Sequence, residues 1–145
     1  MDGFYLTPLP HGFEVRMNAS LALVDTAVEE ARTLCMQKGI ENSLFATLIT
    51  IREGLTNAVR HGSILDKTAW IRFSFCVENQ VIQMEFEDQG PGFDWKKALE
   101  TTAAPESESG RGLQIIRLYS HSMAYSKNGR LLHVTICPSN AFPSD

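Results

Sequence analysis

Hydrophobic and polar positions along the first half of the chain predict one strand and two helices. Residues 13–17 alternate between apolar and polar side chains, which is the period of a strand. A helical period then extends over residues 20–37 and again over residues 42–60. Gly39 and Gly62 follow these segments, and glycine is common just after the end of a helix. We therefore expect a strand followed by two consecutive helices.

Polar residues at the starts of the two predicted helices are suitable N-caps. Ser20 precedes the first helix, and Asn42 or Ser43 precedes the second. One side of the second helix carries a regular apolar stripe that would face a core, made of Leu44, Leu48, Ile51, Leu55 and Ala58. The opposite side is polar, so it is either a solvated face or the place of a functional site.

Two β-hairpins are predicted in the second half of the chain. Residues 69–88 have a period of two that is interrupted near residues 78–80, which favours antiparallel strands joined by a tight turn. Residues 123–126 and 131–137 flank Asn128–Gly129, and an Asn-Gly pair is a strong signal for a hairpin turn. The first hairpin would bury one face and leave the other face wet.

Between the hairpins, the pattern predicts two short helices separated by a polar loop. The helical segments are residues 94–99 and residues 113–119. The intervening residues 100–110 have small, polar and acidic side chains without an apolar anchor, which is typical of a mobile loop. The tail beyond Pro138 is expected to be loosely held.

The resulting order is strand, helix, helix, strand, strand, short helix, loop, helix, strand and strand. Strands adjacent in sequence would pair antiparallel, and the helices can bury their apolar stripes only on one face of the sheet. The predicted fold class is an α/β two-layer sandwich, with a mixed, mainly antiparallel sheet and the helices on one face.

Length, composition and charge narrow the class of protein. The 145 residues suit a single domain with a core over about residues 13–137, and a hydrophobic content of 43% argues against disorder. A net charge of −4 without a basic stripe argues against direct binding to nucleic acid. Apolar runs are too short to span a membrane, and the N-terminus does not resemble a secretory signal.

The cysteines indicate a reducing compartment. Cys35, Cys76 and Cys137 cannot all pair with one another, and they lack the spacing of metal ligands. Buried, reduced thiols are the simplest interpretation, which predicts a cytoplasmic protein.

The second predicted helix carries the first of three candidate motifs. Glu53 and Asn57 are four residues apart and therefore lie on the same face, and His61 continues that face one turn further on. A carboxylate and a carboxamide arranged in this way can handle a proton and hold a metal ion. The alternative is a solvated helix face.

A glycine-rich motif, DQGPGF, follows the first predicted hairpin. Asp88 ends a strand and is followed by Gly90 and Gly92, so a hydrogen-bond acceptor lies beside backbone that a flat ligand can approach closely. Such a carboxylate can recognise the exocyclic amine of a purine. The alternative is an ordinary turn in which Asp88 bonds to nearby backbone.

A second glycine-rich motif, GRGL, opens the helix after the polar loop. At Gly110 and Gly112, unpaired backbone N–H groups and the positive end of the helix dipole converge, which is an arrangement that can hold a phosphate. Arg111 would add a positive charge. The alternative is a hinge for the preceding loop.

The order of the motifs is more specific than any one of them. E-x-x-x-N-x-x-x-H-G, then D-x-G-x-G-F, a polar loop and G-x-G-L resembles the ATP-binding domain of the Bergerat-fold (GHKL) superfamily, over about residues 13–137. The small size and the form EGLTNAVRHG are most similar to the anti-sigma-factor serine kinases. The resemblance implies ATP and Mg²⁺ as cofactors.

The resemblance also implies roles for the matching residues. Asn57 would coordinate Mg²⁺ bridging the ATP phosphates, Glu53 would act as general base toward the attacking hydroxyl, and Asp88 would bind the adenine amino group. Other residues that match the family's adenine pocket, phosphate-closing glycine box or flanking positions are Gly90, Gly92, Gly110, Arg111, Gly112, Leu113, Thr56 and His61.

Two features depart from the family pattern. Many relatives have threonines after the last hairpin turn that help to hold the adenine, whereas this chain reads NGRLLHV, which leaves open whether Thr135 replaces them. The predicted lid, residues 100–110, is short and acidic, which does not favour a phosphate-rich ligand.

By resemblance, the chain is expected to be a cytoplasmic protein serine/threonine kinase of the partner-switching type. It would bind a sigma factor or a similar target and phosphorylate an anti-sigma-factor antagonist on serine. Family members often form homodimers, and the sequence leaves open whether this chain does. The alternative is a non-catalytic ATP-binding interaction module that switches partners through its lid. A histidine kinase is disfavoured because none of the four histidines has the context of a phosphoacceptor helix.

Overall fold

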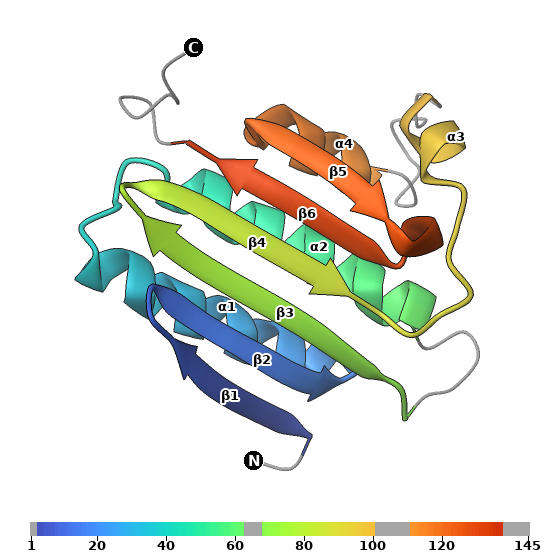
Figure 1. Ribbon diagram of the computed structural model, residues 1–145, viewed down its shortest axis with the longest axis horizontal. Helices are drawn as coiled ribbons and strands as arrows, with labels where there is room; N and C mark the ends of the chain where they lie inside the picture. Colours follow the sequence, from blue (N-terminus) through green and yellow to red (C-terminus); the bar gives the residue numbers. More distant parts are fainter. Residues whose placement is uncertain (1–2, 63–67, 101–110, 138–145) are drawn as a thin grey trace.

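An antiparallel sheet with the strand order β1-β2-β3-β4-β6-β5 forms one layer of the computed structural model, which describes residues 3–62, 68–100 and 111–137 (Figure 1). The strands are β1 (Phe4–Leu9), β2 (Gly12–Asn18), β3 (Trp70–Glu78), β4 (Val81–Glu87), β5 (Ser122–Ser126) and β6 (Leu131–Ile136). The helices are α1 (Leu21–Gln37), α2 (Leu44–Gly62), α3 (Trp95–Glu100) and α4 (Arg111–Tyr119).

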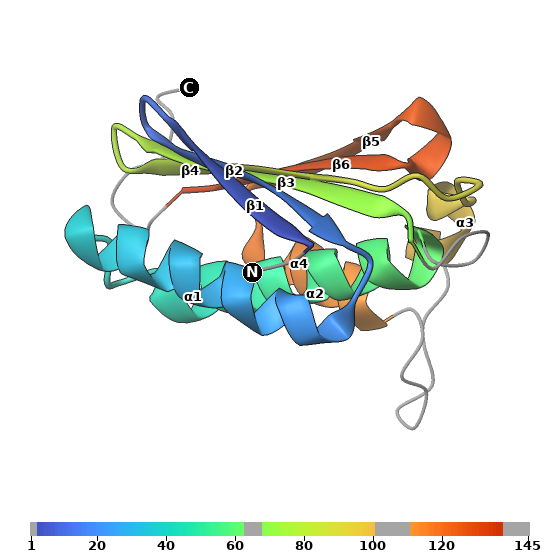
Figure 2. The same ribbon diagram turned by 90° about the horizontal axis from the view of Figure 1, so that it is seen from below.

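Helices α1, α2 and α4 lie together on one face of the sheet (Figure 2). The core between the two layers is formed by the inward-facing residues of the strands and the buried faces of the helices. The predicted α/β two-layer sandwich is therefore confirmed. Each pair of neighbouring strands in the described residues is antiparallel, without the parallel pair that a mixed sheet would contain. This pairing was expected for strands that follow one another in sequence, and it also holds for β4 and β6, which are separated by β5 along the chain.

Strand β1 was not predicted, because Pro8 within it and Pro10 just after it suggest an irregular lead. It pairs with β2 along its whole length and forms one edge of the sheet. Pro8, which lies opposite Phe13, is tolerated there because a proline on an edge strand removes no hydrogen bond from the interior of the sheet. The described sheet thus begins at Phe4, before the first predicted strand.

Helix α2 is buried along more of its surface than the predicted stripe implies. Ile51, Leu55 and Ala58 are buried as expected, but Leu44 and Leu48 are only partly covered. A further stripe of small residues is also buried, namely Thr47, Thr50, Gly54 and Gly62. Small side chains on this stripe let the helix approach the sheet closely, which brings its polar face near the strand ends.

Neither of the two serines predicted as N-caps acts through its hydroxyl. Ser20 immediately precedes α1 but makes no capping hydrogen bond with its hydroxyl. The hydroxyl of Ser43, just before α2, is buried and has no hydrogen-bond partner. The helix limits are nevertheless close to those predicted, because the apolar periods and the glycines at positions 39 and 62 define them.

The pairing of β4 with β6 connects segments that are distant in sequence. Glu87, the last residue of β4, lies opposite Leu131 at the start of β6. The next residues continue this pairing, since the backbone N–H of Asp88 donates to the carbonyl of Arg130 at 2.9 Å. The predicted turns at residues 78–80 and at Asn128–Gly129 are confirmed, and the second turn is thereby placed beside the DQGPGF motif.

Several other predictions can be compared with the structure. The short helices predicted over residues 94–99 and 113–119 are confirmed with shifted limits, as α3 and α4. Cys35 is buried, but Cys76 and Cys137 are half-exposed, so the expectation of three buried thiols was wrong for two of them. The predicted loop from residue 101 onwards and the tail beyond residue 137 lie outside the described residues.

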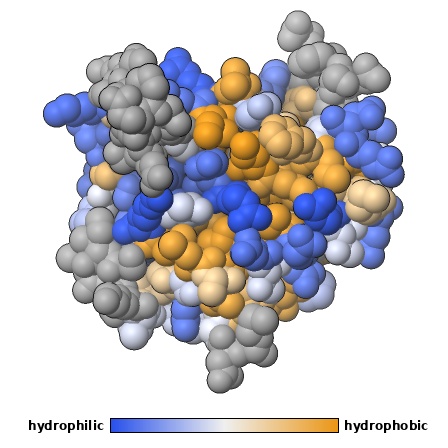
Figure 3. All heavy atoms as spheres, turned by 180° about the vertical axis from the view of Figure 1, so that it is seen from behind, coloured by the Kyte–Doolittle hydropathy of each residue, from blue (hydrophilic) through white to orange (hydrophobic). Residues whose placement is uncertain are grey.

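The helical face of the molecule carries a gathering of apolar side chains (Figure 3). Phe45 and Leu118 have exposed fractions of 67% and 75%, and the ring of Phe45 meets that of Tyr119 edge-on at 5.8 Å. In the described part of the chain, no helix combines the length and the hydrophobicity needed to cross a membrane.

Candidate ATP site

Helix α2 presents its polar face toward the start of α4. A Cβ atom built on Gly112 would lie 2.8 Å from Oε2 of Glu53 and 3.2 Å from Nδ2 of Asn57. A side chain at position 112 would therefore fit only if the Glu53 carboxylate moved. The structure therefore places the glycine of the GRGL motif against the Glu53–Asn57 pair, as the three-motif hypothesis requires.

Asp88 lies at the end of β4, where α2 also ends. Its residue is only 7% exposed, and Oδ1 accepts a hydrogen bond from the backbone N–H of Gly90 at 2.8 Å. Burial raises the pKa of this carboxyl to about 6, although the Gly90 hydrogen bond and the positive charge of Arg130 act in the opposite direction. Asp88 is therefore ionised at neutral pH and is able to accept a hydrogen bond from a ligand.

The glycine-rich turn after Asp88 packs on the hairpin between β5 and β6. Gly92 has a φ of +82°, a conformation that side-chain-bearing residues rarely adopt. The N–H of Phe93 donates to the carbonyl of Asn128 at 3.1 Å. Gly90 passes directly over the carbonyl of His61, so this turn also contacts the end of α2.

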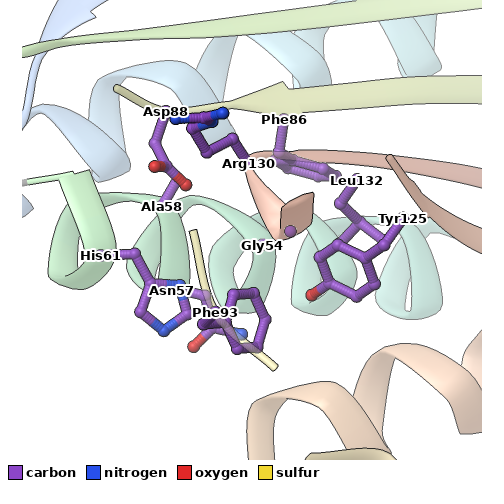
Figure 4. A pocket seen from close by; sticks show the side chains of 11 residues that line it. Gly54, Asn57, Ala58, His61, Phe86, Asp88, Phe93, Tyr125, Arg130 and Leu132 are labelled. Carbon is purple, nitrogen blue, oxygen red and sulfur yellow. The ribbon is translucent and has the colours of Figure 1, made fainter. Parts of the chain in front are cut away.

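A narrow pocket lies among these elements (Figure 4). It is lined by Gly54, Asn57, Ala58 and His61 from α2, by Phe86, Asp88 and Phe93 from β4 and the following turn, and by Tyr125, Gly129, Arg130 and Leu132 from the last hairpin. Asn57 and Asp88, 31 positions apart in sequence, thus face one hollow. Its aromatic walls and single carboxylate suit a flat base that carries an amine.

The aromatic wall is held together by ring contacts. The ring of Phe93 packs on that of His61 with centroids 4.2 Å apart, and it meets the ring of Tyr125 edge-on at 5.4 Å. Burial, with a smaller contribution from Arg60, lowers the pKa of His61, and burial raises the pKa of Tyr125 well above its usual range. Both rings are therefore neutral at pH 7.

Comparison with protein-family models gives a match over residues 17–137 to the histidine kinase-like ATPase domain. The chain belongs to this family. The Bergerat fold expected from the three motifs is thereby confirmed, as is ATP binding by this domain. A comparison with curated proteins gave no match. The narrower similarity to anti-sigma-factor serine kinases stays a prediction.

Not every predicted site residue of the ATPase domain lies at the pocket. Thr56 is half-buried on α2 and Leu113 is buried in the core, and neither lines the hollow. Arg111 is the first residue of α4, and Gly110 lies outside the described residues. Thr135 faces away, because it alternates with Leu132 and Val134, which point to the core. It therefore does not replace the threonines of the relatives.

Eight pocket residues were not predicted as site residues from the sequence, and Gly54, Ala58, Phe86 and Gly129 are four of them. The remaining four are Phe93, Tyr125, Arg130 and Leu132. Phe93 belongs to the DQGPGF motif, but the sequence does not reveal the direction in which its ring points. The other three belong to the last hairpin, and the alternation of that hairpin was a usable signal only once its pairing with β4 was known.

Oxygen ligands are available for a metal ion beside the pocket. Groups of three or more His, Cys, Asp or Glu side chains that could hold a metal by themselves are absent from the described residues. The carboxamide of Asn57 and the carboxylate of Glu53 nevertheless lie together, next to Gly112. Such a sparse set of hard ligands suits an ion that takes most of its coordination from water and phosphate.

Proposed function

We propose that this ATPase domain is a protein serine/threonine kinase of the partner-switching type. It would transfer the γ-phosphoryl group of ATP to a serine of an anti-sigma-factor antagonist, and it would bind a sigma factor or a similar target. The proposal is supported above all by the position of Gly112 against Glu53 and Asn57, next to the pocket that contains Asp88.

The proposed roles follow from the positions of these groups. Asp88 accepts a hydrogen bond from the adenine amine and fixes the base in the pocket. The phosphates then extend along α2 toward the N-terminus of α4, where unpaired N–H groups attract negative charge. Phosphoryl transfer depends mainly on such positioning and on charge neutralisation, so few protein groups are needed.

Asn57 would hold Mg²⁺ through its carboxamide oxygen. A neutral amide fits this task because Mg²⁺ prefers oxygen ligands and keeps several waters. When bound, the ion supplies neutralisation of the phosphate charge. Glu53 lies one helical turn before Asn57 and would accept the proton of the serine hydroxyl as that oxygen attacks.

Partner exchange would follow from the charge of the product. A phosphoserine carries between one and two negative charges at pH 7, and at a protein interface this charge causes repulsion and desolvation cost. The phosphorylated antagonist would therefore leave, and the kinase would be free to bind its other partner. We place this exchange in the cytoplasm, and a homodimer of the kinase is compatible with it.

The kinase proposal is tested by incubating the protein with an anti-sigma-factor antagonist, Mg²⁺ and labelled ATP. We expect phosphoserine on the antagonist with the wild type, and almost none with Glu53→Gln, which should still bind ATP with nearly unchanged affinity. Glu30→Gln, at an exposed position of α1, is the matched control and should behave as the wild type.

A different result would point to the alternative function. Tight ATP binding by the wild type, without phosphoserine on the antagonist under any condition, would remove the kinase claim. If ATP then still controlled partner exchange, and Glu53→Gln left that exchange unchanged, the domain would be an ATP-binding interaction module.

A further inference from the structure

Arg130 is the positively charged partner of Asp88 in the ATP pocket. Among the residues that line this pocket, Asp88 and Arg130 carry a formal charge at neutral pH, because burial lowers the pKa of the histidine there. Asp88 directly follows β4, and Arg130 directly precedes β6 (Figure 4). A base that entered the pocket would therefore meet one charged acceptor and one charged donor.

The backbone fixes the position of Arg130 relative to Asp88. The Asp88 N–H donates to the Arg130 carbonyl at 2.9 Å, in continuation of the pairing between Glu87 and Leu131. The Nε–H of Arg130 donates to the carbonyl of Lys127 at 3.1 Å, which holds the base of the guanidinium toward the turn. The side chain is half-buried, so its orientation is restricted on several sides.

Arg130 retains donors that a ligand can use. Burial has the larger effect and raises the pKa of Asp88, whereas the charge of Arg130 lowers it. Arg130 acts here only through its charge, without a hydrogen bond between the two side chains. A guanidinium has five N–H donors, and one of them is taken by Lys127. The remaining donors are not committed to Asp88.

The arrangement of donor and acceptor matches adenine better than guanine. Adenine presents an exocyclic amine next to a ring nitrogen that accepts a hydrogen bond. Asp88 can accept from the amine, and a guanidinium beside it can donate to the ring nitrogen. Guanine places a carbonyl oxygen where adenine has its amine, and this oxygen would face the Asp88 carboxylate.

We propose that Arg130 is a base-selecting residue of the ATP site, which donates to a ring nitrogen of adenine adjacent to the amine that Asp88 accepts. The inference rests on the ATP binding that underlies the proposed function, and it does not require phosphoryl transfer. Arg130 thereby has a role in nucleotide specificity that the sequence pattern did not predict.

The test is calorimetric binding of ADP, 1-deaza-ADP, 7-deaza-ADP and GDP to four proteins. These are the wild type, Arg130→Ala, Arg130→Lys and Arg117→Ala, the last being an exposed position on α4 that serves as the matched control. We expect Arg130→Ala to weaken ADP binding by about 10- to 100-fold, which is the effect of losing a hydrogen bond from a charged donor. Arg130→Lys should recover part of this loss.

The analogues separate a direct contact from an indirect one. If Arg130 donates to a ring nitrogen, one deaza analogue will bind the wild type as weakly as ADP binds Arg130→Ala, and that variant will not weaken this analogue further. Equal weakening of ADP and of both deaza analogues would overturn the proposal, as would unchanged ADP binding. Thermal melting checks the fold, and if Arg130→Ala does not fold, the same comparison is made with Arg130→Lys.

Failure of this inference is distinguishable from failure of the kinase proposal. Absence of phosphotransfer leaves the binding pattern unaffected. Conversely, a wild type that phosphorylates the antagonist, combined with an Arg130→Ala variant whose preference for ADP over GDP is unchanged, would overturn only the base-selecting role.

Discussion

Gly112 of α4 lies directly against the carboxylate of Glu53 on α2. The two residues are 59 positions apart, yet a Cβ on Gly112 would come within 2.8 Å of Oε2 of Glu53. The neighbouring atom is the end of a flexible side chain, so the contact does not determine the fold. The contact limits the positions that the Glu53 carboxylate can take, and a group proposed to accept a proton must be correctly positioned.

The Gly112→Ala variant should lose phosphoryl transfer more than it loses stability. The added methyl group would displace the Glu53 carboxylate by several tenths of an ångström or more, and a misplacement of about 1 Å can lower a rate by roughly a hundredfold. Alanine is favoured over glycine inside a helix by up to about 1 kcal/mol, so the free energy of unfolding should not fall. Denaturant unfolding and a single-turnover transfer assay measure the two effects.

A Gly112→Ala protein with normal transfer would show that the carboxylate position is not important. Glu53→Ala supplies the comparison, because in that background the methyl group has no carboxylate to displace. Adding Gly112→Ala to Glu53→Ala should then lower the residual transfer rate much less, because only the milder contact with Asn57 remains.

Asp88 should reduce the stability of the folded chain at neutral pH. Its pKa rises from 3.8 to about 6 on folding, mainly through burial, so between these values the folded chain binds more protons than the unfolded chain. The free energy of unfolding therefore falls as the pH rises from about 4 to about 6. A shift of this size corresponds to about 2 to 3 kcal/mol.

Asp88→Asn should remove that penalty and weaken nucleotide binding. The amide oxygen can still accept from the Gly90 N–H, but it introduces no buried charge. Denaturant unfolding should show the variant to be more stable than the wild type above about pH 6 and equal to it below about pH 4. Equal stability at pH 7.5 would contradict the assignment of a raised pKa to this group.

Sequence periodicity predicted most of the fold because each long element has a clear period. The alternation over residues 69–88 and the helical pattern of α2 are both repeated several times, and both elements were confirmed. Strand β1 was missed because an edge strand needs only one hydrogen-bonded side and so tolerates Pro8. The sequence pattern of β1 is the same as that expected for an irregular N-terminal segment.

The candidate site was only partly predictable. Asn57, Asp88 and Gly112 were found because helix pitch and glycine chemistry act over a few residues. Tyr125 and Arg130 were missed, since their place depends on the pairing of β4 with β6, which joins residues more than 40 positions apart. Such a pairing is decided by packing of the whole sheet and has no local signal.

Gly54→Ala should destabilise the protein through overpacking against the sheet. A Cβ on Gly54 would lie 2.6 Å from Cε1 and Cζ of Phe86, a fully packed ring that cannot move as a flexible side chain does. Overpacking typically costs about 1 to 3 kcal/mol, and the better helix propensity of alanine offsets up to about 1 kcal/mol of it. Denaturant unfolding measures the net loss.

The double variant Gly54→Ala/Phe86→Leu identifies the cause of that loss. Leucine is smaller than phenylalanine, so the double variant should be less destabilised than the sum of the two single variants. Additive losses would mean that the methyl group clashes elsewhere or is accommodated by movement of α2.

Arg72 on β3 should stabilise the open face of the sheet, opposite the helices. Its guanidinium donates to Glu87 at 2.9 Å, to Glu85 at 3.0 Å and to Glu14 at 3.3 Å, so one cation lies among three carboxylates. The side chains are partly exposed, which reduces the strength of these ion pairs. Arg72→Met should nevertheless lower the free energy of unfolding by about 1 to 2 kcal/mol at pH 7, because it leaves the carboxylates facing one another.

The effect of Arg72→Met should depend on pH in a defined direction. Lys127, followed by Arg72, lowers the pKa of Glu87, so the folded pKa lies below the unfolded one. Stabilisation from such a group is present above the unfolded pKa and is lost as the pH falls through the folded pKa. The difference between wild type and variant should therefore shrink in acid, while Arg16→Met, an exposed neighbour on β2, should change stability by less than about 0.5 kcal/mol at either pH. A difference that stays constant down to pH 3 would indicate that Arg72 acts through packing of its aliphatic stem and not through charge.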